Sequence, residues 1–231
     1  MFLFLSSLLA SAAEFGPTLE GEMLTSEVEL EGDTGGVSCS DQFLRDGVQL
    51  PDLPLFYVRN QPDAEWGTVE MIDLLVDAGR HVRWLMPSAS PFVVGDISRT
   101  RGGELSGHIT HRGGVDADIG IYKKGGWQHP HGFTTLAPSE LDVVATWALM
   151  QTFLDSGMVD FILLDTGHIR ALRAYTLKRG LLTSEEADRI FPSDGPHGGW
   201  NSSGIVRHAP HHQDHLHLRV LCGDGTKSSG Y

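Results

Sequence analysis

Two short segments of the sequence concentrate histidine and aspartate in patterns that could do chemistry. The first runs from His108 to Asp118 and the second from His211 to His217. Histidine is the commonest metal ligand among side chains, and its imidazole also exchanges protons near neutral pH. The segments are roughly a hundred residues apart, so only the fold can join them. Together they predict one metal site built from two distant parts of the chain.

The first segment leads into a predicted strand. Apolar and polar residues alternate from Val115 onward, which is typical of a half-buried strand. Asp116 and Asp118 therefore project from one face, where two like charges repel unless a cation or hydrogen-bond donors compensate them. Asp116 alone is equally consistent with a turn or strand-end residue. A glycine pair between His111 and the strand predicts a turn that folds this histidine back over Asp118.

The second segment has the same alternation. His215, His217 and Arg219 alternate with apolar residues, so the three polar side chains share one face of a strand while the leucines enter the core. Residues two apart on a strand are about 7 Å apart. One imidazole can then bind a metal while its neighbour contacts a metal-bound water. Arg219 either holds a substrate carboxylate or forms a structural ion pair with an aspartate.

Joining the segments gives His111, Asp118 and His217 as three nitrogen or oxygen ligands. That set is typical of catalytic zinc, which keeps a place for water, whereas structural zinc prefers a closed, cysteine-rich shell. Water on such an ion can ionise near neutral pH, and the ion polarises a carbonyl. His215 is predicted to take or relay the proton of this water, with His212 one step further out. An HExxH motif is absent, which excludes the helix-borne zinc peptidases.

Five other histidines are interpreted as surface, capping or core residues without a role in the chemistry: His81, His129, His131, His168 and His197.

The overall charge excludes another class of function. The chain has 17 Lys+Arg against 30 Asp+Glu, a formal net charge of −13. Binding a nucleic acid along a broad surface relies on Lys and Arg neutralising phosphates. Nucleic acid is therefore excluded as a partner.

The ends of the chain predict export. Residues 1–13 are uncharged, apolar and end in small residues, as in a secretory signal peptide, and the run is too short to span a membrane. No later stretch is predicted to span one. Residues 14–49 are acidic and predicted to be a largely disordered leader, followed by one catalytic domain over residues 50–231. In an exported protein a disulfide between Cys39 and Cys222 is the natural use of two thiols, the alternative being two unpaired buried cysteines.

The predicted fold class is α+β, a small central antiparallel sheet that carries the zinc site, with flanking helices. The sequence shows neither a repeat of strand–helix–strand units nor a phosphate-binding glycine motif. These absences favour α+β over a doubly wound fold. Amphipathic periodicity and cap signals predict the following elements: a helix over 68–78 ended by Gly79, a helix from Ser139 to Gly157, a strand over 158–164, a helix over 169–179 ended by Gly180, and a capping box of Thr183 with Glu186 that starts a short helix.

The two histidine segments carry a resemblance to a known family. SGHITHRGGVDADIGIY (106–122) and HHQDHLHLRV (211–220) resemble the signature segments of the penicillin-insensitive murein endopeptidases. These belong to a wider group of lysostaphin-like, D-Ala-D-Ala-cleaving and hedgehog-type zinc proteins that share H-x6-D and a later H-x-H. The resemblance implies zinc ligands at His111, Asp118 and His217 and catalytic histidines at His215 and His212. His108 matches a family histidine that either reaches a metal or lies one hydrogen bond behind it.

The resemblance also implies a function. It predicts export to the periplasm and hydrolysis of peptidoglycan cross-links that contain D-alanine and meso-diaminopimelate. Two alternatives stay open: a carboxypeptidase or dipeptidase that acts on terminal D-Ala-D-Ala, and a non-catalytic zinc domain that binds wall peptides or another protein. A binding domain needs the ligands but not proton-handling histidines, so the presence of His212 and His215 favours an enzyme.

Overall fold

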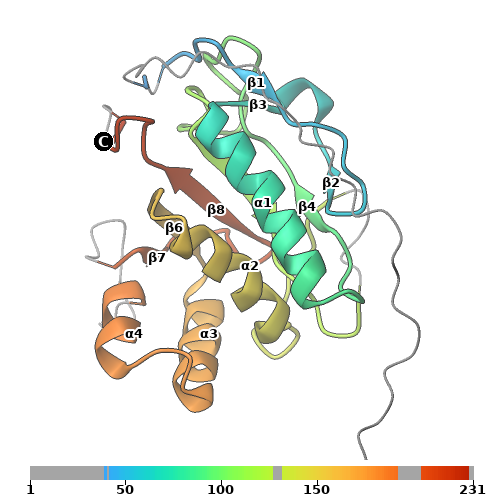
Figure 1. The fold of residues 1–231 in the computed structure, drawn as a ribbon, viewed down its shortest axis with the longest axis vertical. Helices are drawn as coiled ribbons and strands as arrows, with labels where there is room; N and C mark the ends of the chain where they lie inside the picture. The colour runs from blue at the N-terminus through green and yellow to red at the C-terminus, as the bar shows by residue number, and fades with distance from the viewer. Residues whose placement is uncertain (1–38, 41, 127–131, 192–203, 229–231) are drawn as a thin grey trace, which may run out of the picture. The chain divides into compact units, whose positions relative to one another are not determined.

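The fold is α+β, as predicted, and is described by a computed structural model for residues 39–40, 42–126, 132–191 and 204–228. Figure 1 shows its helices and strands. The helices are α1 (Val69–Leu85), α2 (Val143–Asp155), α3 (Thr166–Arg179) and α4 (Ser184–Ile190), with a 3₁₀ turn at Pro62–Ala64. The strands are β1 (Val48–Gln49), β2 (Tyr57–Arg59), β3 (Trp66–Gly67), β4 (Phe92–Val94), β5 (Asp116–Gly120), β6 (Val159–Leu164), β7 (Val206–His208) and β8 (His215–Val220).

The larger sheet has the strand order β2-β4-β5-β8-β6-β7, and β1 pairs with β3 in a small second sheet. The predicted central antiparallel sheet is present, and one parallel strand is added at each edge. Strands β4, β5, β8 and β6 are antiparallel, but β2 pairs with β4, and β6 with β7, in parallel. Parallel strands cannot be joined by a tight hairpin. The chain therefore crosses through α1 between β2 and β4, and through α3 and α4 between β6 and β7.

The central strands β5 and β8 place polar and apolar residues on opposite faces of the sheet, as their alternation predicts. Asp118 is opposite His217 and Ile119 is opposite Leu216. The apolar set is fully buried on the face that α1 and α2 cover. The polar set, which includes Asp118 and His217, lies on the other face. The polar side chains of the sheet thus lie on the side away from α1 and α2.

Helix α1 begins as predicted but ends later. The Thr68 side chain caps it by accepting a hydrogen bond from the Met71 amide, and the helix continues to Leu85, past the predicted end at residue 78. Gly79 lies inside the helix rather than after it. A Cβ at this position would lie 2.6 Å from the Cβ of Phe56. The glycine is explained by this close approach and not by a helix end.

Two other helix starts differ from prediction, while the ends agree. Helix α2 is capped by Asp142, not Ser139, because the Asp142 carboxylate accepts from the amides of Val144 and Ala145. Helix α3 begins three residues earlier than predicted, at Thr166, because Asp165 caps it. Its predicted end at Gly180, which has φ 65°, is confirmed. The strand β6 and the capping box of α4 are also confirmed.

The predicted disulfide between Cys39 and Cys222 is confirmed, with a Cα–Cα distance of 5.4 Å. Of the segment predicted as a leader, residues 42–49 pack against the domain: Leu44 is buried, and Val48–Gln49 form β1. The predicted signal peptide and the leader up to residue 38 lie outside the described residues. Within the described part of the chain, no helix has the length and apolar content needed to cross a membrane.

His168, on α3, is expected to make the protein sensitive to acid. Its side chain is completely buried, and this burial lowers the pKa of the imidazole against the opposing effect of Asp165. The unfolded chain therefore binds a proton that the folded chain does not, so stability falls as the pH drops below about 6.5 toward the folded-state pKa.

We expect a His168→Gln variant to lose less of its unfolding free energy between about pH 7 and pH 5 than the wild type. Urea unfolding across this range would measure the two slopes. His81→Gln, a matched change at an exposed position on α1, should keep the wild-type slope. Equal slopes for the wild type and the His168→Gln variant would contradict the prediction.

Candidate metal centre and active site

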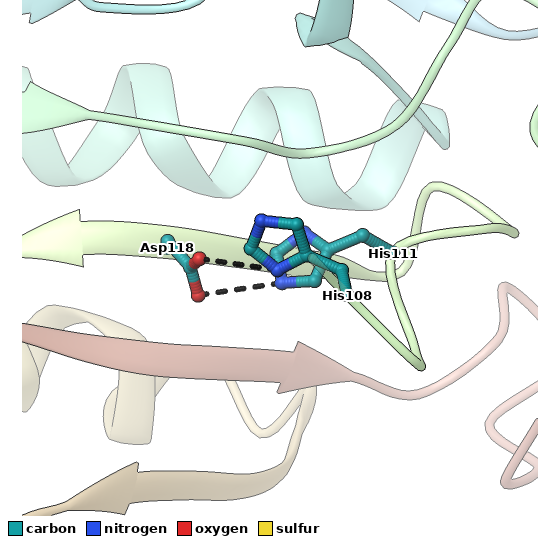
Figure 2. Close-up of side chains that lie close together, drawn as sticks. All are labelled: His108, His111 and Asp118. Carbon is teal, nitrogen blue, oxygen red and sulfur yellow. Dashed lines mark ion pairs between the residues drawn. The ribbon is translucent and has the colours of Figure 1, made fainter. Parts of the chain in front are cut away.

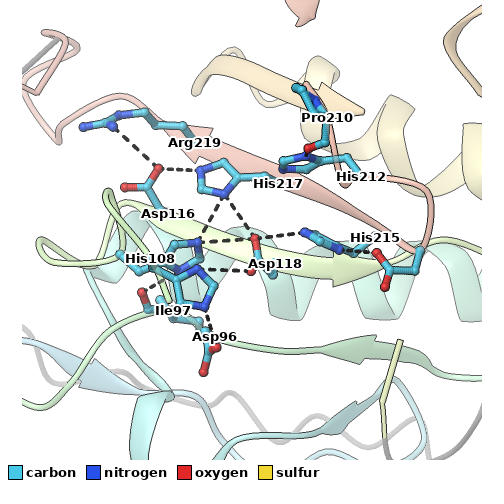
Figure 3. A network of polar contacts seen from close by, with 12 residues as sticks. Asp96, Ile97, His108, Asp116, Asp118, Pro210, His212, His215, His217 and Arg219 are labelled. Atoms are coloured by element: carbon cyan, nitrogen blue, oxygen red, sulfur yellow. Dashed lines mark hydrogen bonds and ion pairs between the residues drawn. The ribbon is translucent and has the colours of Figure 1, made fainter. Parts of the chain in front are cut away.

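Three donor atoms from β5, β8 and the loop before β5 converge on the open face of the sheet (Figure 3). His111 Nε2 lies 3.2 Å from His217 Nδ1 and 3.3 Å from Asp118 Oδ1. His217 Nδ1 lies 3.1 Å from Asp118 Oδ1. All three side chains are buried. The fold therefore brings together the two histidine segments in the way that the sequence predicts.

Hydrogen bonds at the far side of each ring orient the two imidazoles. The Nδ1–H of His111 donates to the Ile97 carbonyl, 3.1 Å away. The Nε2–H of His217 donates to the Asp116 carboxylate, 2.8 Å away. When both rings are neutral, these bonds leave a lone pair on His111 Nε2 and on His217 Nδ1, both directed toward Asp118. A carboxylate or carbonyl behind a ligating histidine is the usual way in which a protein fixes its tautomer and ring angle.

This arrangement concentrates negative potential and calls for a positive charge. Burial disfavours charge on His217, but its hydrogen bonds to Asp116 and Asp118 outweigh that effect and raise the pKa of the imidazole to about 9. Burial alone would raise the pKa of the Asp118 carboxyl. The contacts with His111 and His217 outweigh this effect and hold that pKa well below its usual value. The site therefore favours a proton or a metal cation between these groups.

The spacing of the three donors fits a metal ion. Zinc in proteins is tetrahedral with bonds of about 2.0–2.2 Å, which places its ligand atoms about 3.3 Å apart. The three distances between His111, Asp118 and His217 are 3.1–3.3 Å. A wider set, in which His108 replaces His217, also satisfies the geometry of a metal site, with one ligand atom of each residue within 4.8 Å of the others (Figure 2). Both sets share His111 and Asp118.

His108 lies beside this centre and is held by a second carboxylate. Its Nε2 lies 2.8 Å from Asp96 Oδ2, and its Nδ1 lies 3.7 Å from Asp118 Oδ2. The hydrogen bond to Asp96 is the main cause that raises the pKa of this imidazole. Asp96 had no role in the sequence prediction. With one nitrogen on Asp96 and the other toward Asp118, His108 is placed for either of its two predicted roles.

His215 lies next to the metal triangle with one ring nitrogen available. Its Nδ1–H donates to Asp214 Oδ1, 2.6 Å away, and its Nε2 lies 3.7 Å from Asp118 Oδ1. The ring stacks on Phe133, with centroids 4.9 Å apart and an interplanar angle of 19°. Asp214 and Phe133 together fix the ring so that Nε2 faces the metal side.

His212 lies one ring away from His215, as predicted. The two ring centroids are 4.8 Å apart. The Nδ1–H of His212 donates to the Pro210 carbonyl, 2.7 Å away. Burial lowers the pKa of His212 to about 4. This imidazole is therefore neutral at pH 7 and presents Nε2 as a hydrogen-bond acceptor.

The structure separates the two interpretations of Arg219. Its side chain is 2% exposed, too little for a substrate carboxylate to contact the guanidinium. Its Nη1 lies 3.6 Å from Asp116 Oδ1, and its Nε–H donates to the Ser228 hydroxyl, 3.1 Å away. Arg219 is a structural partner of Asp116, which in turn holds His217.

Of the five histidines predicted to have no role in the chemistry, two lie on described helices. His81 is exposed on α1, and His168 is buried on α3. His129, His131 and His197 lie outside the described residues.

Two residues that contact His215 were not predicted from the sequence. Asp214 directly precedes His215, and neighbours on a strand point to opposite faces, so strand alternation does not predict a contact between them. However, β8 begins only at His215, and the aspartate before it can turn back to the ring. Phe133 is far from β8 in sequence and carried no signal that links it to His215.

One family model matches part of the chain. The family model described as penicillin-insensitive murein endopeptidase matches residues 39–149, which confirms the resemblance read from the motifs. The matched range contains His108, His111 and Asp118 but ends before β6, so the second histidine segment lies outside it. No curated protein matches the chain.

Proposed function

Because residues 39–149 match the penicillin-insensitive murein endopeptidase family, we propose that this protein is an exported zinc endopeptidase. Its substrate is the D-alanyl–meso-diaminopimelate type of peptide cross-link in peptidoglycan. The observation that supports this proposal most directly is the triangle of His111, Asp118 and His217, whose donor atoms are spaced as zinc ligands. His108 completes the metal side of the site, either on the ion or behind it.

Zinc bound by these residues supplies a Lewis acid that polarises a scissile carbonyl and makes a water molecule more acidic. The chain's own contribution is proton handling. His215 Nε2 is free to accept a proton, because Nδ1–H already donates to Asp214. The same nitrogen can return the proton to the leaving amine, and the Asp214 carboxylate stabilises the imidazolium in between.

His212 supports this step from the side. Its pKa of about 4 keeps it neutral at pH 7, so it adds no positive charge beside the imidazolium of His215. Its free Nε2 can accept a hydrogen bond from substrate or water. A neutral His212 beside the Nε2 acceptor of His215 fits an enzyme better than a purely binding domain, which needs no proton acceptor.

Export to the periplasm is part of the proposal. The disulfide between Cys39 and Cys222 is a type of bond that persists in oxidising compartments and is rare in the cytosol. The peptidoglycan substrate of the family lies outside the cytoplasm as well. Mass spectrometry of the protein recovered from a periplasmic extract would locate it and show the first residue of the mature chain.

The decisive experiment is digestion of purified sacculi by the zinc-loaded protein, with chelator as control. We expect dimeric muropeptides to decrease and monomers to increase, and chelator to prevent both changes. Release of free D-alanine from monomeric pentapeptides without loss of dimers would identify a carboxypeptidase instead. Binding to sacculi without any product would identify a non-catalytic zinc domain and end the proposal of an endopeptidase.

The Asp214→Asn variant should test the role of the carboxylate behind His215. Asparagine keeps the shape but not the charge, so the imidazolium loses its stabilising partner. We expect kcat to fall by about 100-fold or more, within the range of general acid–base catalysis, while KM and zinc affinity stay near wild type. Muropeptide kinetics and competition with a chromogenic chelator measure the two effects. A proportional loss of zinc affinity would instead make Asp214 part of the metal-binding structure.

A further inference from the structure

One arginine lies in the same row of the sheet as the metal triangle. Asp118 of β5 is opposite His217 of β8, His217 is opposite Leu163 of β6, and Leu163 is opposite Arg207 of β7. Residues directly opposite one another project from the same face. Strands are about 4.8 Å apart, which places the Cα of Arg207 about 10 Å from that of His217. Arg207 therefore belongs to the face that carries the chemistry.

The Arg207 guanidinium is held in a fixed position on this face. Its carbon lies over the Phe161 ring, 5.0 Å from the centroid, and the Phe161 ring is stacked on His217 with an interplanar angle of 13°. The Nε–H of Arg207 donates to the Gly204 carbonyl, 2.9 Å away. Stacking and this hydrogen bond restrict a side chain that would otherwise lose rotamer freedom on binding a ligand.

These contacts leave the terminal part of the guanidinium available. Among the described residues, Arg207 forms no ion pair with a carboxylate, and its hydrogen bond uses Nε alone. The side chain is half-buried rather than enclosed. The two Nη groups of an arginine form a planar fork that matches a carboxylate in a bidentate pair. Arg219, the neighbouring arginine, is buried and paired with Asp116.

Several carboxylates surround the site, and a positive group beside them would assist the binding of an acidic substrate. Asp96, Asp116, Asp118 and Asp214 lie in or next to the centre, and the whole chain has a formal charge of −13. Each of these carboxylates repels a substrate carboxylate that comes near it. A fixed guanidinium beside the site offsets the repulsion at one point and so determines how the peptide is oriented.

We infer that Arg207 binds a free carboxylate of the peptide substrate and orients that peptide across β6 and β8. The inference rests on the proposed function, in which the substrate contains meso-diaminopimelate, a residue with a carboxylate at each of its two ends. The ligand class is thus an anionic peptide whose carboxylate lies next to the bond to be cleaved.

The test compares two synthetic cross-linked peptides, one with the free diaminopimelate carboxylate and one in which it is amidated. For the Arg207→Gln variant we expect KM to rise by about 10- to 100-fold on the free peptide, the usual effect of losing a charged hydrogen bond. On the amidated peptide, wild type and variant should have the same KM. Arg207→Lys should recover part of the loss, and kcat should change little.

Arg170→Gln is the matched control, because Arg170 is exposed on α3, and it should leave both KM values unchanged. A KM increase of the same size on both peptides would overturn the inference, since it would mean that Arg207 only supports the fold. If the wild type cleaves neither peptide, the proposed function fails separately. Calorimetric binding of the same peptides to the wild type and the Arg207→Gln variant would then decide the role of Arg207.

Discussion

Replacement of His217 by alanine is expected to abolish cleavage of cross-linked muropeptides and to weaken zinc binding by more than about 100-fold, beyond the usual effect of losing an outer partner of a ligand. The reason is geometric. His217 supplies one corner of the donor triangle through Nδ1, and its other nitrogen is bonded to Asp116. Without the ring, the closely spaced triangle is lost, and His111 and Asp118 keep only the wider set with His108.

Equilibrium competition with a chromogenic chelator measures the zinc affinity, and muropeptide analysis measures the activity. His81→Ala is the matched control, because His81 is exposed on α1, and this variant should behave as the wild type. Asp118→Ala should show the same double loss as His217→Ala. Full hydrolysis by either site variant would rule out the proposed mechanism, whatever its zinc content.

The second large effect concerns stability. Cys39 and Cys222 are separated by 183 positions, so their bond closes nearly the whole domain into one loop. In the chain-entropy model a loop of this length stabilises the folded state by about 5 kcal/mol. We expect the double variant Cys39→Ser, Cys222→Ser to lose free energy of unfolding on this scale, which is a large part of the stability of an ordinary domain.

Urea unfolding of metal-free protein, with and without reductant, measures this loss. Reductant should lower the stability of the wild type to that of the double variant and have no effect on the variant itself. If the reduced wild type and the double variant both unfold at the same urea concentration as the oxidised protein, the loop-closure argument fails. Metal must be removed first, because a ligand that binds the folded state adds its own stabilisation.

Much of the site could be predicted from sequence because it lies on regular strands. The alternation in β5 and β8 determines which side chains share a face, so it predicts which face of its strand carries Asp118 and which carries His217. Their pairing across the sheet then follows from burial of the leucines on the opposite face. His111 and Asp118 are close in sequence, so the H-x6-D motif also predicts their contact.

What could not be predicted depends on contacts between distant residues. Gly79 resembles a helix end until its contact with Phe56 is seen. The parallel pairs at the sheet edges involve strands of three residues, too short for a periodic signal. The roles of Phe133 and Arg207 depend on the rings that they contact, which are those of His215 and Phe161. Both contacts join residues that are far apart in sequence, so the sequence does not predict them.

The register of β5 against β8 also bears on how the protein folds. Asp118 and His217 are 99 positions apart in the chain, and contacts over such separations form slowly because a long loop must close before they contribute any stability. A shift of the pairing by one residue would turn every donor away from its partners. A metal ion held by these donors would bind only the correctly paired strands and so would favour the native register, and the proposed site does not exist until the sheet is complete.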